Sequence, residues 1–184
     1  YDFMLDGNGD PTTTVANAIV ETFDNNGLLW TWSGDYGVVS GTTGQHATPA
    51  GDTTNYVTVP TNLSVLPNSA TIDFGASYNY FGLFWGSVDD YNTLSFIKND
   101  VEIYSFTGSD IAPPADGNQS SDLTNLYVNF YFDGGEMFDK VKMSSTSYAF
   151  EADNLAVAAV PEPTTMLLFG MGLLGLAGAG RRRK

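Results

Sequence analysis

The sequence contains no cysteine and only one histidine among its 184 residues. Without cysteine, the fold has no disulfide bonds, and the protein has no thiol nucleophile or thiolate metal ligand. The single histidine, His46, stands in the loop-like stretch 44–49, and no serine lies in a G-x-S-x-G motif. Neither a zinc site nor a hydrolase triad is therefore indicated. We expect no enzyme; a catalytic pair of carboxylates, whose spacing one sequence cannot reveal, stays open as the alternative.

Basic residues are also scarce. Lys98, Lys140 and Lys142 are the only basic side chains before the C-terminal tail, against 21 acidic residues. A protein that binds nucleic acid needs a basic surface, so we expect no nucleic-acid partner. Aromatic residues make up 14% of the chain, well above the content of disordered segments. The body is therefore expected to be a folded, acidic domain, compatible with export and with the binding of divalent cations.

No stretch before the tail keeps a helical period. Short runs of β-branched and aromatic residues alternate instead with Gly, Asn, Asp and Pro turns, which is typical of a sandwich or barrel. In the clearest run, 126–132, Val128, Phe130 and Phe132 share one face. We predict an all-β fold, an antiparallel jelly-roll-like β-sandwich over residues 15–159. Its expected strands are 17–24, 28–33, 36–40, 55–59, 69–75, 79–86, 92–98, 101–107, 125–133, 137–144 and 147–157.

The segments between the predicted strands carry turn signals. Lys98–Val101 predicts a tight hairpin. Residues 108–122 are expected to form a long polar loop of a kind that is often functional or mobile. Residues 1–14 are expected to be a flexible N-terminal segment. Its stretch Asp6–Asp10 resembles the start of an EF-hand loop, but Pro11 stands where that loop requires glycine, so no EF-hand is predicted.

The end of the chain combines three signals in a fixed order. Residues 160–165 form a rigid element, because each of its prolines fixes φ. The uncharged run 164–180 is at the short end of the lengths that cross a bilayer as a helix. The basic cluster 181–184 would then place the C-terminus in the cytoplasm and the body outside. A plain tail anchor and a buried helix are the alternatives. The residues concerned are Val160, Pro161, Glu162 and Pro163 in the rigid element and Arg181, Arg182, Arg183 and Lys184 in the basic cluster.

This order of signals resembles the PEP-CTERM sorting signal of exosortase-dependent surface proteins of Gram-negative bacteria. The resemblance covers residues 160–184 and implies that an exosortase, a membrane protease-transpeptidase, cuts at or near Pro-Glu-Pro after transient anchoring in the inner membrane. The rest of the chain would then reach the cell surface or the extracellular matrix, in the exopolysaccharide of a biofilm. An exported body also requires a signal peptide. Because the sequence starts at Tyr1 without such a leader, we expect that it was removed or that the start is truncated.

The body has a resemblance of its own. Tyr80–Phe96 and Phe150–Val157 are similar to jelly-roll members of the same group of surface proteins. The closing Phe-Glu-x-Asp-Asn-Leu-x-Val also resembles the last strand of many carbohydrate-binding β-sandwiches, in which an acidic residue of that strand joins one near the first strand at a structural calcium. This resemblance implies Asp153, with Glu21 or Asp24, as oxygen ligands of calcium. Alternatively, Asp153 and its neighbour hydrogen-bond nearby backbone at a strand bulge.

Aromatic side chains are the candidates for contact with a polysaccharide, because their faces stack on sugar rings. The tyrosines near predicted turns are the expected stacking residues, whereas the three tryptophans could equally belong to the core. The expected function is that of a non-enzymatic, exported surface or matrix protein sorted by an exosortase. The alternative is a carbohydrate-binding module of the exopolysaccharide matrix, with or without structural calcium. The tyrosines are Tyr78, Tyr80 and Tyr91, and the tryptophans are Trp30, Trp32 and Trp85.

Overall fold

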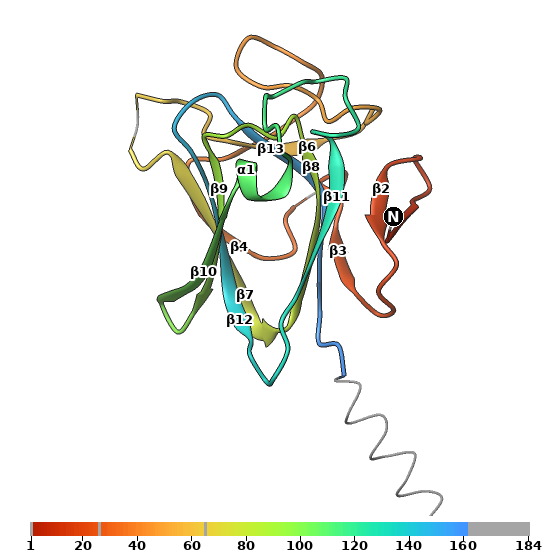
Figure 1. Cartoon of the computed structure of the whole chain (residues 1–184), viewed down its shortest axis with the longest axis vertical. Coiled ribbons are helices and arrows are strands. Elements are labelled where there is room, and N and C mark those ends of the chain that lie inside the picture. Colours follow the sequence, from red (N-terminus) through yellow and green to blue (C-terminus); the bar gives the residue numbers. More distant parts are fainter. Residues whose placement is uncertain (1, 26, 65, 162–184) are drawn as a thin grey trace, which may run out of the picture.

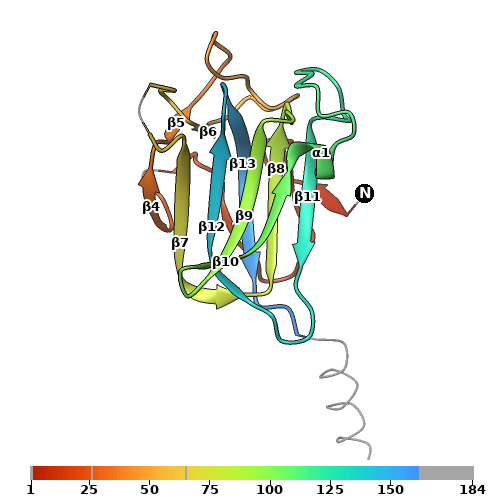
Figure 2. The same ribbon diagram turned by 60° about the vertical axis from the view of Figure 1, so that its left-hand side comes forward.

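The computed structural model describes residues 2–25, 27–64 and 66–161. In these residues, thirteen strands and one short helix form two sheets that face each other, with a small two-stranded sheet beside them (Figures 1 and 2). Their bounds are β1 Phe3–Leu5, β2 Pro11–Thr13, β3 Ile19–Glu21, β4 Thr31–Gly34, β5 Gly37–Val39, β6 Tyr56–Val59, β7 Ser69–Tyr78, β8 Tyr80–Gly86, β9 Asn92–Lys98, β10 Val101–Thr107, α1 Gly108–Ile111, β11 Leu126–Tyr131, β12 Phe138–Ser145 and β13 Phe150–Ala158.

Both large sheets are antiparallel throughout their described pairings. The five-stranded sheet has the order β10-β9-β12-β7-β4, and the six-stranded sheet has the order β11-β8-β13-β6-β5, with β3 also paired to β13. Strand β13, the last of the described strands, therefore lies in the middle of its sheet (Figure 2). The predicted antiparallel β-sandwich is confirmed.

The core lies between the two sheets and follows the period of two along each strand. In β7, Ala70, Ile72 and Phe74 are buried, while the intervening side chains are partly exposed. The ring of Phe96 in β9 is surrounded by five other phenylalanine rings, with centroids 4.9–6.2 Å away. Each fully buried aromatic or aliphatic side chain contributes about 1.5–3 kcal/mol relative to an exposed one. Alternation of apolar residues thus creates both the strands and the core that holds them together.

Several local predictions are confirmed. Phe130 and Phe132 are buried, and Val128 packs against the same core. The predicted hairpin at 98–101 joins β9 to β10, with Lys98 paired to Val101. Its two central residues, Asn99 and Asp100, have φ of 51° and 63°, as a type I′ turn requires.

Other predicted bounds were too wide. The expected strand 17–24 is reduced to β3, and Phe23 beyond it has a φ of 58°, which interrupts an extended strand. The expected strand 147–157 begins only at Phe150. The loop predicted at 108–122 opens with the single turn α1, which is capped by Thr107 and Asp110. The pattern of apolar residues does not predict this turn, because polar side chains form the hydrogen bonds that cap it.

The N-terminal segment, residues 2–13, is not an unpaired stretch. The predicted flexible segment 1–14 contains a hairpin of β1 and β2, which lies against the outer face of the six-stranded sheet (Figure 1). Thr12 and Thr13 are buried, and Thr13 Oγ1 lies 2.6 Å from the hydroxyl of Tyr80. The hairpin docks through polar contacts rather than through an apolar face, so hydrophobic periodicity did not reveal it.

The predicted transmembrane helix 164–180 and the basic cluster 181–184 lie outside the described residues, as do Glu162 and Pro163. Within residues 2–161 as described, no helix is long and apolar enough to cross a membrane.

Candidate functional site

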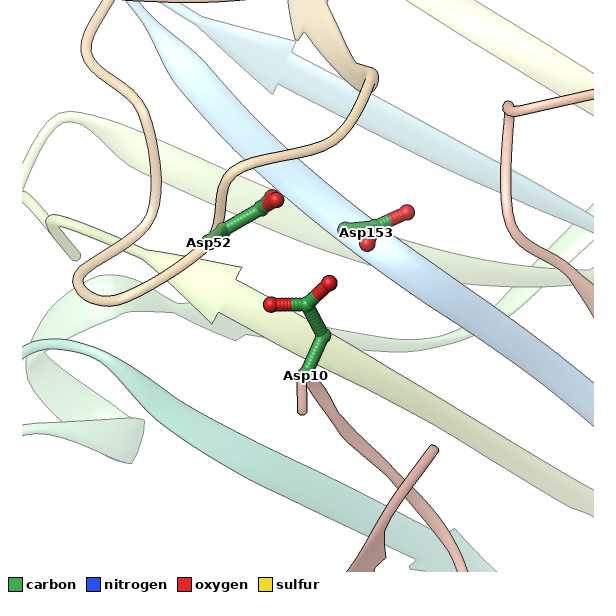
Figure 3. A group of neighbouring side chains, drawn as sticks. All are labelled: Asp10, Asp52 and Asp153. Atoms are coloured by element: carbon green, nitrogen blue, oxygen red, sulfur yellow. The ribbon is translucent and has the colours of Figure 1, made fainter. Parts of the chain in front are cut away.

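Three aspartate side chains from distant parts of the sequence meet on the outer side of the six-stranded sheet (Figure 3). Asp10 directly precedes β2, Asp52 lies in the loop between β5 and β6, and Asp153 lies in β13. One carboxylate oxygen of each lies within 4.8 Å of the others. Only 1%, 6% and 1%, respectively, of these residues' surfaces are exposed. We call these three residues the carboxylate cluster.

A bulge in β13 turns Asp153 toward the cluster. The pairing of β13 with β8 shifts register between Asp153 and Ala156, and Asn154 has a φ of 49°. Ala152 and Leu155 both belong to the core, so the two residues between them lie off the core face. Asn154 Nδ2 donates to the carbonyl of Pro11 at 3.1 Å. The predicted bulge is therefore present, and it also positions a carboxylate.

The surroundings of the cluster favour the neutral form of its carboxyl groups. Burial, together with the nearby charges of Asp52, Asp10 and Asp24, raises the pKa of Asp153 to about 9. Burial and the charges of Asp52 and Asp6 raise the pKa of Asp10 to about 6, and burial also raises the pKa of Asp52. No lysine balances them, because the three lysines of the described chain are engaged in ion pairs on the five-stranded sheet.

Two oxygen atoms of the cluster lack a hydrogen-bond donor. Asp52 Oδ1 accepts the backbone N–H of Thr54 at 2.7 Å and its hydroxyl at 2.8 Å. Asp52 Oδ2 and Asp153 Oδ1 are buried and have no hydrogen-bond partner. A buried charge without a partner is costly, whereas a divalent cation is bound by such oxygens. All potential metal ligands in the cluster are oxygen atoms, and no basic side chain of the described chain balances their charge. Such a set of ligands fits a hard divalent cation.

The structure brings only one of the predicted calcium ligands into the carboxylate cluster. Asp153 is a member of the carboxylate cluster, but Glu21 is not, because its two oxygens accept the backbone N–H groups of Phe23 at 3.0 Å and Leu29 at 2.7 Å. Glu21 therefore stabilises the chain after β3. Asp24 adds negative charge near the cluster. Its oxygens accept the backbone N–H of Asn55 and the side-chain amide of Asn8, and Asp24 is not a member of the cluster.

Asp10 and Asp52 were not predicted as ligands. Asp10 lies in the stretch that resembles the start of an EF-hand loop, so the sequence did indicate cation binding there. The structure places Asp10 in a different backbone geometry from that of an EF-hand. Asp6 Oδ1 accepts the backbone N–H groups of Asn8 and Asp10, so the stretch folds as a tight turn rather than a calcium loop. Asp52 stands in a Gly- and Thr-rich loop with no motif, and only the fold brings it to β13.

A polar cleft of about 160 Å³ lies at the end of the sandwich from which β13 begins. Glu151 is one of the residues that line it: it is 2% exposed, and its oxygens accept the backbone N–H of Ala47 at 2.9 Å and the hydroxyl of Ser87 at 3.2 Å. Burial raises the pKa of Glu151 to about 8, and burial and neighbouring acidic groups raise the pKa of Asp89. Residues lining the cleft include His46, Ser87, Asp89, Tyr91, Tyr148 and Glu151.

The predicted stacking tyrosines have different environments. Tyr80 is completely buried under the N-terminal segment, and its hydroxyl donates to Asn129 Oδ1 at 2.7 Å, so the prediction that its ring is exposed is wrong. Tyr78 is half-buried, with its ring 5.9 Å from that of Phe74. Tyr91 is half-buried and lines the polar cleft, and its hydroxyl donates to the carbonyl of Tyr148 at 2.8 Å.

The tryptophans belong to the core, which was one of the two alternatives. Trp85 is completely buried and stacks on Phe150 at a centroid distance of 4.2 Å. Trp30 and Trp32 are partly buried and pack against the same core. The aromatic rings therefore build the sandwich first, and of the predicted stacking residues only Tyr91 reaches the cleft.

The sorting segment starts where the sandwich ends. Strand β13 stops at Ala158, and the side chain of Asn79 then holds Val160. Asn79 Oδ1 accepts the backbone N–H of Val160 at 2.6 Å, and Asn79 Nδ2 donates to the carbonyl of Val160 at 2.8 Å. Pro161, which follows, is exposed.

This segment matches a known family model: residues 159–184 match the model of the PEP-CTERM protein-sorting motif. The chain carries a PEP-CTERM sorting motif. The motif is a signal of exported proteins of the cell envelope that an exosortase processes. It begins one residue after β13, so the motif and the sandwich follow each other without a spacer.

The body of this PEP-CTERM protein has distant structural neighbours. The family 32 carbohydrate-binding module of Clostridium perfringens NanJ, solved with galactose, is 17% identical over 68% of this chain and 92% of that chain, with a TM-score of 0.39. CpGH89CBM32-6 of the same organism is 10% identical over 76% and 100%, with a TM-score of 0.37. The family 32 module of AlyQ, solved with 4,5-unsaturated mannuronic acid, is 17% identical over 50% and 70%, with a TM-score of 0.31. These values are too low to transfer a ligand, and no curated protein matches the chain.

Proposed function

We propose that the chain is a non-enzymatic surface or matrix protein, which an exosortase cuts at the Pro-Glu-Pro element so that the folded sandwich is released from the inner membrane. The observation that carries this proposal is the sorting motif at 159–184, directly after the last strand. Residues 164–180 would hold the precursor in the membrane, and the four basic residues would keep its C-terminus in the cytoplasm.

The end of the sandwich supports a cut at this point. All thirteen strands of the described chain end before the Pro-Glu-Pro element, so cleavage there leaves every described strand and core residue in the released product. The hydrogen bonds between Asn79 and Val160 close the last strand on the body side of the cut. The released product would therefore keep its complete fold.

The role of the basic cluster can be tested by fractionation. Replacing Arg181, Arg182, Arg183 and Lys184 with glutamine removes the charges that set the orientation of the tail. We expect a clear loss of the membrane-bound precursor relative to the wild type. The matched control replaces Lys98, Lys140 and Lys142 on the body with glutamine, which should leave membrane retention unchanged. Unchanged fractionation of the tail variant would contradict the proposed topology.

A second candidate function is carbohydrate binding, and the polar cleft favours it. The cleft offers carboxylate, hydroxyl, amide and imidazole groups at the loop end of the sandwich, which suit a polyhydroxylated ligand better than an anion. Glu151 is buried and both of its oxygens accept hydrogen bonds from the body itself, so its carboxyl group is held in a fixed position in the cleft wall. Binding is therefore a better proposal for this cleft than hydrolysis.

A pull-down with exopolysaccharide purified from the producing cells tests this candidate. Asp89→Asn removes a charged acceptor from the cleft while keeping its shape, and we expect binding at least about tenfold weaker. Asp122→Asn, in an exposed loop position, is the matched control and should bind like the wild type. Equal binding by the wild type and Asp89→Asn, or no binding on a broad glycan array, would exclude the cleft as a glycan site.

A further inference from the structure

We propose that the carboxylate cluster is a calcium site, and that calcium binding there controls the docking of the N-terminal segment, residues 2–13, on the six-stranded sheet. This inference is independent of the sorting motif and of the polar cleft. It concerns a ligand and a conformational equilibrium of the folded body. An experiment that refutes the calcium site would therefore leave the proposed sorting untouched, and the reverse also holds.

The geometry of the cluster suits one ion. Two oxygens bound to the same calcium ion at about 2.3–2.6 Å can lie at most about 5 Å apart. The nearest carboxylate oxygens of Asp10, Asp52 and Asp153 lie within 4.8 Å of one another. Asp52 Oδ2 and Asp153 Oδ1 are the buried oxygens without a hydrogen-bond donor, and each belongs to a residue more than nine-tenths buried. An ion among the three carboxylates would give both oxygens a partner.

The chemistry of the cluster selects calcium among common cations. All three side chains are carboxylates, whereas zinc sites usually contain histidine or cysteine. Magnesium requires a nearly ideal octahedron with shorter bonds, while calcium accepts irregular oxygen sets. Ligands from a turn, a loop and a bulged strand form an irregular set of this kind. We therefore expect calcium to bind more tightly than magnesium.

The N-terminal segment depends on the cluster because Asp10 belongs to it. Its other contacts are mainly polar: Thr13 with Tyr80 at 2.6 Å, and Pro11 with Asn154 at 3.1 Å. Met4 and Leu5 in β1 remain 54% and 61% exposed, so little apolar burial holds the segment. Without a cation, the docked state keeps three buried carboxyl groups within 4.8 Å of one another, where each must stay protonated or carry a charge without a counter-ion, and undocking returns Asp10 to water. With calcium bound, the same movement breaks a metal ligand, so calcium should keep the segment docked.

The experiment is a calcium titration of the full chain, followed by thermal unfolding and by hydrogen exchange. Extracellular calcium modules bind with a Kd of about 0.1–1 mM, and we expect this range. At a hundredfold excess over Kd, the melting temperature should rise by about 5–10 °C. Amide exchange in residues 2–13 should slow by at least about tenfold when calcium replaces chelator. Magnesium at the same concentration should have a smaller effect.

Conservative variants distinguish a metal ligand from a merely structural residue. Asp10→Asn, Asp52→Asn and Asp153→Asn remove one negative charge each and keep the shape of the side chain. In chelator they should be as stable as the wild type or more stable, because each amide replaces a buried acid that must stay protonated or carry an unpaired charge. In calcium they should be less stable than the wild type. A residue with only a structural role would lower stability under both conditions, and the control Asp122→Asn should respond to calcium like the wild type.

Three outcomes would overturn the proposal. The calcium site is excluded if about 10 mM calcium, well above the expected Kd, leaves the melting temperature of the wild type unchanged. It is also excluded if Asp153→Asn keeps the full calcium response. The coupling is excluded if calcium stabilises the protein but leaves hydrogen exchange in residues 2–13 unchanged. The wild-type titration needs no variant, so it remains decisive even if a variant fails to fold.

Discussion

Replacing Pro161, Glu162 and Pro163 together with alanine should stop the release of the protein from the membrane. The two prolines give the segment a rigid shape and the glutamate adds a charge, and a protease positions its scissile bond through such features. Misplacement of a reacting bond by about 1 Å costs about 10²-fold in rate, so we expect processing to slow by about a hundredfold or more. The measurement is a pulse-chase of the wild type and the variant, with the membrane and surface fractions separated.

The matched control replaces Pro113 and Pro114 in the exposed loop after α1 with alanine, which removes two prolines far from the tail. This control should be processed like the wild type. If the triple variant at 161–163 is released at the wild-type rate, the Pro-Glu-Pro element is not the recognition feature, and the proposed role of these residues is contradicted.

Trp85→Ala should remove a large part of the stability of the sandwich. Trp85 in β8 is completely buried, and its ring stacks at 4.2 Å on that of Phe150 in the neighbouring strand β13. Truncation of a buried Trp or Phe to Ala costs about 3–5 kcal/mol, because contacts are lost and a cavity remains. Total stabilities of about 5–15 kcal/mol are usual, so this loss is large. Urea unfolding followed by circular dichroism measures it.

Trp85→Phe provides the sharper comparison. The indole Nε1 of Trp85 is buried without a hydrogen-bond partner, so the smaller ring keeps the stacking and removes an unsatisfied donor. We expect a loss below about 2 kcal/mol for this variant. Leu123→Ala, at a position 72% exposed, should change stability by less than about 0.5 kcal/mol. If Trp85→Ala unfolds at the wild-type urea concentration, Trp85 is not in the core and the stacking on Phe150 is wrong.

The sandwich was predictable because most of its strands carry a clear period of two. The alternating apolar residues Ala70, Ile72 and Phe74 in β7, and Val141 and Met143 in β12, are all buried in the structure. The N-terminal segment was not predictable in this way. Its docking rests on polar contacts such as that between Thr13 and Tyr80, and these depend on a partner 67 positions away in the sequence.

The carboxylate cluster was only partly predictable for a similar reason. Asp153 was found through the resemblance of the last strand to other β-sandwiches, and the bulge that turns it outward was among the expectations. Asp10 and Asp52 carry no motif that links them to Asp153. They come together only because the N-terminal hairpin docks on the sheet and the loop before β6 follows its particular path. Neither feature could be predicted from a single sequence. Glu21 was a reasonable candidate by position, but backbone donors had already satisfied both of its oxygens.

The sorting motif was the most readable part of the chain, because its three signals are local and need no tertiary contact. The structure adds what the sequence could not show, namely that Asn79 hydrogen-bonds to Val160 and that all described strands end before the Pro-Glu-Pro element. A cut in this element would therefore separate a finished domain from its tail.

The most direct test of the central claim is the intact mass of the protein recovered from the surface fraction of its own cells. We predict a mass whose C-terminal end lies at residues 160–163, with or without an added group, because exosortase processing at the Pro-Glu-Pro element leaves the sandwich and removes the tail. A mass that includes every residue through Lys184 would contradict cleavage and would make the tail a permanent anchor.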